Sequence, residues 1–347
     1  MPSKVGGLFG SKVSGSMSRK RKNPTNARFG IGEWYGRLLP SLSLDERQQL
    51  AAHAQGRGDK PPCPFKPMID GNPQPCSKKG GVCSLRLYDR GEEPGTAVPA
   101  SGPGSALRAV CPNRFRQDET VESWVGEVLL GTDRPLAVGE VGFLTSESVS
   151  DLSSEPDNPS EEDGDDVGRI DSVLMHPDLE SFSWCAVELQ AVYFSGPGMG
   201  SEFKQAEAYN GEGFPFPNAI RRPDYRSSGP KRLMPQLQIK VPTLRRWGKK
   251  MAVVVDEAFF SALGKMDDVP EPSNADIAWF IVRFEEHGAT AELQRLRVQF
   301  TTLERAVEGL TAGRPVSLPE FERRIRQKLA ETQKSPRRPR RTTTYLD

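Results

Sequence analysis

The stretch WCAVELQAVYF, residues 184–194, constrains the fold of this chain more than any other segment. Apart from Glu188 and Gln190 its side chains are apolar or aromatic, which predicts a β-strand built for burial. Residues two apart on a strand face the same way, so Glu188 and Gln190 project together, while Val187 and Leu189 face the other side. A carboxylate and an amide on one side of such a strand indicate either a solvent-exposed strand end or a chemical role.

Helix and strand patterns alternate along the rest of the chain, which indicates an α/β or α+β domain with a mixed sheet. Residues 56–115 are rich in Gly, Pro and Cys and are expected to be mostly loop, as is 195–230. Further strands are expected at 137–144, 169–176, 251–255, 277–284 and 296–303. Helices are expected within 29–55 (one or two) and at 118–130, 231–249, 256–265 and 317–331.

The formal net charge of +1 conceals a strong separation of charge along the chain. Residues 145–168 hold nine acidic and no basic residues, whereas 1–28 hold seven Lys or Arg and no acid, and 334–341 hold five. Clustered positive charge favours a polyanionic partner, nucleic acid above all. The chain has no apolar run of the roughly 18–20 residues that a membrane span needs, and no secretory signal at its start, so we expect a cytoplasmic protein without membrane contact.

Four cysteines, Cys63, Cys76, Cys83 and Cys111, lie in a segment with few large apolar residues. Such a segment builds little core, and a bound metal would supply the missing folding energy. Four thiolates form a tetrahedral site that suits zinc or a single iron, and the alternative is four free thiols in loops. Cys185 lies in the apolar strand and is expected to be a small core residue.

A second acidic residue precedes the opening strand. The segment GRIDSVLMH carries Asp171, and pairing of this segment with 184–194 would place Asp171 beside Glu188. Two converging carboxylates and a backbone carbonyl form an oxygen site suited to magnesium, which assists phosphodiester hydrolysis. The alternative is polar residues exposed at a strand end. Asp178 is a less suitable candidate, because it follows Pro177 among turn-forming residues.

The ordered combination of CPF at 63–65, GVC at 81–83, CPNR at 111–114 and ELQ at 188–190 resembles the NotI-type restriction endonucleases. These belong to the PD-(D/E)xK nuclease superfamily, in its Glu-x-Gln variant. The resemblance implies a PD-(D/E)xK core and a homodimer that cuts palindromic double-stranded DNA with magnesium. It also implies one iron held by the four cysteines, catalytic positions at Asp171, Glu188 and Gln190, and a cognate DNA methyltransferase acting on the same site.

Gln190 stands where the superfamily usually has Lys, and an amide cannot act as a general base. We therefore expect Gln190 to position a water molecule. A further acid from the helix at 118–130 is expected to assist, and the sequence leaves Glu122 and Glu127 as equal candidates. The long acidic insertion and the basic ends depart from the family pattern.

The segment 231–250 holds seven Lys or Arg and no acid, with apolar residues at helical spacing. Pro242 is expected to kink or break this helix. A basic helix of this kind is either a DNA-contacting element or an ordinary amphipathic helix with a solvated face. In the first case the expected DNA contacts are Arg232, Lys240, Arg245, Arg246 and Lys249.

These patterns divide the chain into a disordered basic arm (1–28), a helical lead-in with a four-cysteine metal domain (29–115), a catalytic domain (116–332) with a disordered acidic insertion (145–168), and a basic tail (333–347). The favoured function is that of a type II restriction endonuclease. The alternatives are a non-catalytic, metal-stabilised DNA-binding protein, and a related repair or defence nuclease without palindromic specificity.

Overall fold

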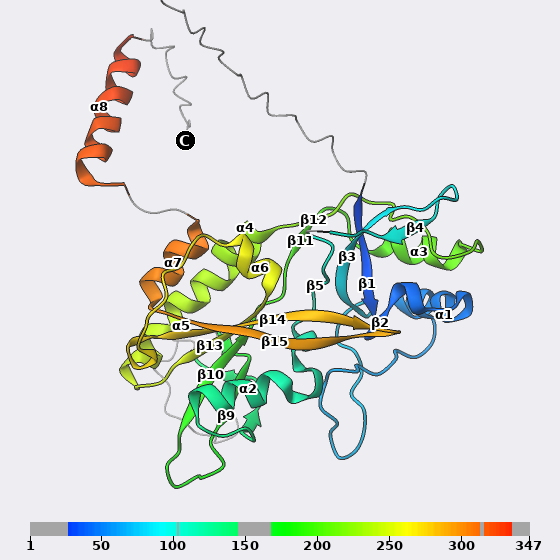
Figure 1. Ribbon diagram of the computed structural model, residues 1–347, viewed down its shortest axis with the longest axis horizontal. Helices are drawn as coiled ribbons and strands as arrows, with labels where there is room; N and C mark the ends of the chain where they lie inside the picture. The colour runs from blue at the N-terminus through cyan, green and yellow to red at the C-terminus, as the bar shows by residue number, and fades with distance from the viewer. Residues whose placement is uncertain (1–26, 103, 145–167, 313–315, 335–347) are drawn as a thin grey trace, which may run out of the picture.

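The computed structural model describes residues 27–102, 104–144, 168–312 and 316–334. Within these ranges eleven strands form one curved sheet, in the order β4-β3-β1-β2-β15-β14-β13-β10-β9-β6, with β5 paired to β3 (Figure 1). The expected mixed sheet flanked by helices is therefore confirmed. The predicted basic arm up to residue 26, the acidic insertion over 145–167 and the tail from residue 335 lie outside the described residues. None of the described helices is long and apolar enough to cross a membrane.

The strands that carry Asp171 and Glu188 belong to the C-terminal half of the sheet. There β9 and β10 form an antiparallel hairpin, β10, β13 and β14 run parallel, and β14 and β15 form a long antiparallel hairpin. The strands predicted in these regions are confirmed. Their bounds are β6 (Leu136–Val138), β9 (Ser172–Met175), β10 (Trp184–Leu189), β13 (Met251–Asp256), β14 (Ile277–His287) and β15 (Thr290–Thr301).

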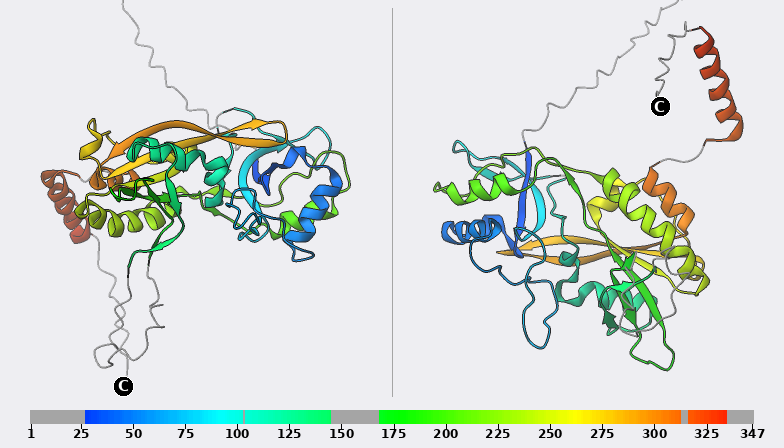
Figure 2. Two further views of the ribbon diagram at one scale, coloured as in Figure 1. Left: turned by 90° about the horizontal axis from the view of Figure 1, so that it is seen from below. Right: turned by 180° about the vertical axis from the view of Figure 1, so that it is seen from behind.

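Helices cover both faces of this half of the sheet, and the two faces follow from the alternation along β10 (Figure 2). Val187 and Leu189 pack in one core with α2 (Thr120–Leu129), while Ala186 packs in the other with α5 (Met234–Arg246). The α5 face is completed by α6 (Glu257–Ala262) and α7 (Leu303–Thr311), of which α7 was not predicted. Of the two predicted effects of Pro242, a kink or a break, the break is wrong, since α5 continues past Pro242 to Arg246.

The N-terminal half of the sheet departs from the sequence expectation. The segment from Arg28 to Leu38, where no strand was predicted, forms two strands. At Gly30 and Gly32 neighbouring side chains approach the backbone more closely than a Cβ would allow. Residues 82–90 form a long strand rather than loop, and 200–208 form a helix. The bounds are β1 (Arg28–Trp34), β2 (Arg37–Leu38), β3 (Val82–Arg90), β4 (Ala97–Pro99), β5 (Arg108–Ala109) and α3 (Gly200–Ala208).

The predicted helix at LSLDERQQLAAHA is confirmed as α1 (Leu44–Ala54), which begins with a capping box between Ser43 and Glu46. The N-terminal half has its own core, and it joins the rest of the sheet where Arg37 of β2 pairs with Thr290 of β15. Shorter elements complete the described chain: η1 (Leu39–Ser41), η2 (Pro112–Glu119), β7 (Val141–Gly142), β8 (Arg169–Ile170), β11 (Phe194–Ser195), β12 (Arg222–Pro223), α4 (Tyr225–Ser228), η3 (Gly229–Leu233) and η4 (Pro272–Asn274).

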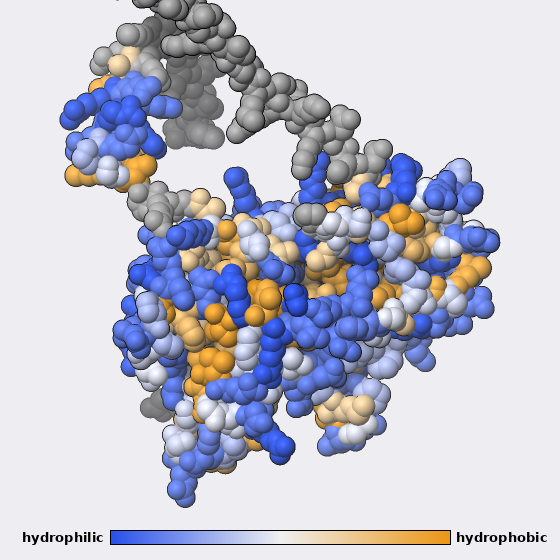
Figure 3. Space-filling model, viewed as in Figure 1, coloured by the Kyte–Doolittle hydropathy of each residue, from blue (hydrophilic) through white to orange (hydrophobic). Residues whose placement is uncertain are grey.

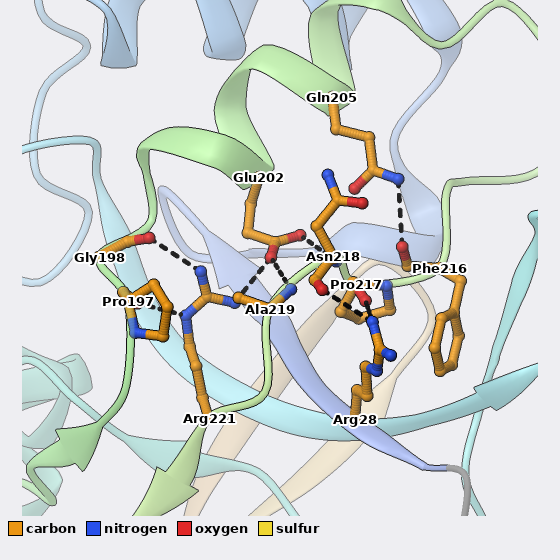
Figure 4. Close-up of polar contacts among 10 residues, drawn as sticks. All are labelled: Arg28, Pro197, Gly198, Glu202, Gln205, Phe216, Pro217, Asn218, Ala219 and Arg221. Carbon is orange, nitrogen blue, oxygen red and sulfur yellow. Dashed lines mark hydrogen bonds and ion pairs between the residues drawn. The ribbon is translucent and has the colours of Figure 1, made fainter.

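A buried ion pair holds the long connection between β11 and β12 in place (Figure 4). The Glu202 carboxylate of α3 accepts hydrogen bonds from the backbone N–H groups of Asn218 and Ala219 and from Arg221. Arg221 in turn donates to the carbonyls of Pro197 and Gly198. Both ends of the connection are thereby tied to α3.

The last described helix, α8 (Leu318–Lys334), is the expected closing helix. Figure 1 shows it apart from the body, and Figure 3 shows apolar side chains on it among charged ones. The exposed apolar residues recur at helical spacing and are Leu318, Phe321, Ile325 and Leu329.

Candidate active site

The hairpin of β9 and β10 brings two carboxylates together. The last paired residues are Ser172 and Val187, so the next position on each strand places Asp171 opposite Glu188. Asp171 lies at the bend between β8 and β9, and its Oδ2 accepts a 2.8 Å hydrogen bond from the backbone N–H of Leu189. The predicted juxtaposition of Asp171 and Glu188 is present in the structure.

The surroundings of both carboxyl groups disfavour their negatively charged forms. Glu188 is only 4% exposed. Burial, and then repulsion from Asp171, raise the pKa of Glu188 to about 7. Burial also raises the pKa of Asp171. A divalent cation between the two groups would relieve this repulsion, and carboxylate oxygens are the donors that magnesium prefers. Asp171 and Glu188 are therefore side chains that could hold magnesium, although the described residues add no third His, Cys, Asp or Glu to the pair as a ready metal site.

Lys240 is not a surface contact for DNA, and this expectation is corrected. Its side chain is 5% exposed, and Nζ lies 2.8 Å from Oε2 of Glu188. The spacing of the apolar residues along the helix indicates that Lys240 is buried, which the sequence analysis did not recognise. Position 240 lies three residues after Leu237 and four before Leu244, both fully buried, so it belongs to the apolar stripe of α5 that faces Glu188.

Gln190 follows the last residue of β10 and is partly buried. Its backbone N–H donates to the carbonyl of Val254 at 3.0 Å, and its side-chain amide donates to the carbonyl of Ala191 at 2.6 Å. The side chain lines a cleft rather than contacting the Asp171 carboxylate through a hydrogen bond in the described structure.

The structure distinguishes the two upstream glutamates. Burial raises the pKa of Glu122, whose Oε1 lies 3.7 Å from Arg116, and Arg116 donates to the backbone carbonyl of Asp171. Glu127 instead faces solvent and pairs with Arg295. Glu140, which the sequence did not single out, is close enough to Asp171 to raise its pKa electrostatically.

Asp178 lies away from this site. It belongs to the turn that joins β9 to β10, where its backbone N–H donates to Nδ1 of His176 and its Oδ1 accepts from the N–H of Glu180. These contacts are those of a turn residue, in agreement with the sequence interpretation.

A cleft of about 650 Å³ opens next to Leu189 and Gln190, the two residues that follow Glu188, although neither carboxylate of the pair lines it. Tyr193 also lines the cleft, as do Lys78 and Lys79 of the cysteine-rich segment. Arg232 lies with its guanidinium 4.4 Å from the centre of the Tyr193 ring. The two lysines were not predicted as contacts, although the run CSKKGG placed them beside Cys76.

The model of the family described as restriction endonuclease NotI matches residues 46–295, which include the carboxylate pair, the cleft and all four N-terminal cysteines. The chain belongs to the NotI restriction endonuclease family. It is accordingly a type II site-specific deoxyribonuclease, which decides against the non-catalytic alternative. A comparison with curated proteins found no match.

The four thiols of this NotI-family enzyme are buried and close enough to influence one another. A hydrogen bond with Cys76 lowers the pKa of Cys63 to about 6, while burial raises the pKa of Cys83 and of Cys111. Among the described residues no group of three or more His, Cys, Asp or Glu side chains is arranged as a finished metal site. Cys185 packs in the core between β10 and α2, as expected.

The other predicted DNA contacts are Arg232 in η3, Arg245 and Arg246 at the end of α5, and Lys249 just after that helix. Lys249 Nζ lies 5.3 Å from the ring of Trp184, which is four residues and about 13 Å along β10 from Glu188. Arg245 pairs with Asp276 and Glu304, and Arg246 donates to the Thr243 hydroxyl. In the NotI-family enzyme these three residues could contact DNA only at a distance from the carboxylate pair, whereas Arg232 lines the cleft itself.

Proposed function

We propose that this restriction endonuclease uses magnesium, held by Asp171, Glu188 and the Leu189 carbonyl, to hydrolyse a phosphodiester bond in a palindromic double-stranded DNA sequence. The observation that carries the proposal is the juxtaposition of the buried Glu188 carboxylate with Asp171 across the hairpin of β9 and β10, next to a cleft that Gln190 lines together with Lys79 and Arg232. When bound, magnesium would activate a water molecule and offset the charge that develops on the phosphate.

The chain's own residues would position the DNA in the cleft. Lys79 and Arg232 line the cleft together with Gln190, so a phosphate group entering the cleft would meet their positive charge, whereas the Lys78 ammonium donates to the Val110 carbonyl. The Gln190 amide, released from the Ala191 carbonyl, would orient the attacking water. Glu122, through Arg116, would keep the backbone of Asp171 in place.

The proposal extends to a structural metal on Cys63, Cys76, Cys83 and Cys111, with iron as the first choice and zinc as the alternative. Four buried thiols from separate parts of the sequence suit a soft, tetrahedral site. Their mutual repulsion on ionisation would be offset by the cation. The thiols would have to draw together on binding, since the described residues do not form a finished site.

A palindromic site presents the same phosphodiester bond on both strands, related by a twofold axis, and two copies of the chain match that symmetry. We therefore include a homodimer in the proposal. An enzyme that cuts its site wherever it occurs also requires protection of the host's own copies, so a DNA methyltransferase acting on the same sequence is the proposed partner. The five unbridged cysteines suit the reducing cytoplasm as its location.

The test is cleavage of plasmid DNA with magnesium by the wild type, by Glu188→Gln and by Glu292→Gln. Glu292 is the matched control, since it begins the second Glu-Leu-Gln of the chain but lies exposed on β15. We expect discrete bands from the wild type and from E292Q, and no cleavage by E188Q, with specific DNA binding in calcium retained. A smear would contradict site specificity, and normal cleavage by E188Q would place the site elsewhere.

A further inference from the structure

Lys240 is a buried cation whose hydrogen bonds are directed into the carboxylate site. From α5 its ammonium donates to Oε2 of Glu188 at 2.8 Å and to Oε1 of Gln236 at 3.3 Å. A buried amine is costly unless it is paired, and a buried pair contributes little net stability compared with apolar residues of the same shape. Its presence on the apolar face of α5 therefore calls for a reason other than stability.

The charges around Lys240 do not balance. Glu188 contributes a buried carboxylate and Asp171 a partly buried one, and Lys240 offers one ammonium, which contacts Glu188. Arg116, the other cation near Asp171, donates to the Asp171 backbone carbonyl and is paired with Glu122. Gln190, two residues along from Glu188, supplies no charge, and its amide donates to the Ala191 carbonyl. With both carboxyl groups ionised, the site retains negative charge that a divalent cation can neutralise and a single lysine cannot.

A second buried ion pair shows what a purely structural arrangement looks like in this protein. Glu202 is held by two backbone N–H groups in addition to Arg221, so its carboxylate is fixed from several directions (Figure 4). In the described part of the chain the hydrogen bond that Glu188 accepts comes from Lys240. Movement of one flexible side chain therefore suffices to free Glu188.

We propose that Lys240 is a positioning residue of the hydrolytic site, the counter-ion that holds Glu188 until a divalent cation takes its place. This inference rests on the proposed function, because it assigns Glu188 to magnesium. Once displaced from the carboxylate, the ammonium stays anchored by Gln236 at the edge of the site. There it offsets negative charge on the bound phosphate, a contribution that the uncharged Gln190 cannot make.

The inference makes opposite predictions for magnesium binding and for cleavage. In Lys240→Met the cation no longer competes with the ammonium, so magnesium should bind about tenfold more tightly in calorimetry. Its thermal stability in EDTA should fall, because the buried Glu188 carboxylate loses its counter-ion, and magnesium should raise its melting temperature by more than that of the wild type. Single-turnover cleavage at saturating magnesium should nevertheless fall about a hundredfold.

Two further variants complete the test. Arg221→Met removes the cation from the Glu202 pair, so its stability should fall equally with and without magnesium. Lys240→Gln keeps a hydrogen-bond donor without the charge and should reproduce the tighter magnesium binding of K240M. Recovery of either Lys240 variant as folded protein only when magnesium is present would also support the inference.

Three results would overturn it. Unchanged magnesium affinity in K240M and K240Q, with a wild type that binds magnesium and cuts DNA, would reduce Lys240 to a structural role and leave the proposed function standing. Failure of both variants to fold even with magnesium would have the same meaning. A wild type that neither binds magnesium nor cuts with it would remove the proposed function and this inference together.

Discussion

The Oδ2 atom of Asp171 accepts a 2.8 Å hydrogen bond from the backbone N–H of Leu189, the residue that follows Glu188. This bond fixes the Asp171 carboxylate against the strand that carries its partner. Magnesium requires near-ideal octahedral geometry, and a carboxylate held by the backbone meets that requirement better than one in a turn. The aspartate that works in catalysis should therefore be Asp171 rather than Asp178.

Asp171→Asn should eliminate magnesium-dependent cleavage, a loss of several kcal/mol of transition-state stabilisation typical of a missing metal ligand. Asp178→Asn is the matched control, since Asp178 lies seven residues later in an exposed turn, and it should lose less than about tenfold, or ~1.4 kcal/mol. Single-turnover rates of both variants check the prediction. The reverse ranking would reject the assignment of Asp171 while leaving the enzyme a nuclease.

The carboxylate pair could be predicted from sequence because Glu188 lies on one strand of a local hairpin and Asp171 lies immediately before the other. The period of two along 184–189 determines which side Glu188 faces, and the short connection determines its partner. Lys240 is different, because it reaches Glu188 from 52 residues away through the packing of α5 on the sheet. A run of basic residues suggested a solvated face, and only the tertiary contact shows that one of them is buried.

The N-terminal strands could not be predicted for a related reason. The segment RFGIGEW carries two glycines, which lower strand propensity. Their structural role depends on the packing of Leu107 and Pro217 against them, which the local sequence does not show. In the same way Lys78 and Lys79 belong to the cleft because the cysteine-rich segment lies against the end of β10. Contacts between segments far apart in sequence leave no local periodicity to read.

The purified protein should carry about one metal ion per chain, iron or zinc, on its four N-terminal cysteines. Replacing any one of Cys63, Cys76, Cys83 and Cys111 with Ser should remove the metal and lower the melting temperature by roughly 5 °C or more. Cys185→Ser is the control, because this thiol lies in the core between β10 and α2 and should leave the metal content unchanged. Elemental analysis that finds neither metal in folded wild-type protein would contradict the prediction.

Deletion of residues 148–166 should leave folding and cleavage intact. The strands on either side of this segment pair with each other, Val141 with Ile170 and Gly142 with Arg169, so a short connection is long enough to join them. Removing an acidic, weakly hydrophobic run should also tighten non-specific DNA binding. Circular dichroism, plasmid cleavage and binding to a non-cognate duplex check these outcomes. Insoluble protein after the deletion would show that the segment contributes to the folded structure.

Asp256 provides a test of the fold that is independent of the active site. Its carboxylate caps α6 by accepting from the N–H of Phe259 at 2.7 Å, and it also accepts from the N–H of Ala109. Burial raises its pKa from 3.8 to about 6. Between these values the folded state binds more protons than the unfolded chain. As the pH rises through that window, the ionisation of Asp256 should therefore lower the free energy of unfolding of the wild type by up to about 3 kcal/mol.

Asp256→Asn removes the ionisation, so its stability relative to the wild type should improve steadily from below pH 3.8 to above pH 6. Asp224→Asn is a control of opposite sign. Asp224 caps α4 in an exposed position, and hydrogen bonds from Ser227 lower its pKa, so the wild type gains from its charge as the pH rises. D224N should accordingly lose stability relative to the wild type as the pH rises toward 3.8, below the Asp256 window, and the difference should stay constant above it. Urea unfolding of the three proteins across this pH range measures both differences. If the free energy of unfolding of D256N follows the same pH dependence as that of the wild type, the Asp256 carboxylate must be hydrated. The junction between β5 and α6 would then be open to water, contrary to the burial of Asp256 in the structure.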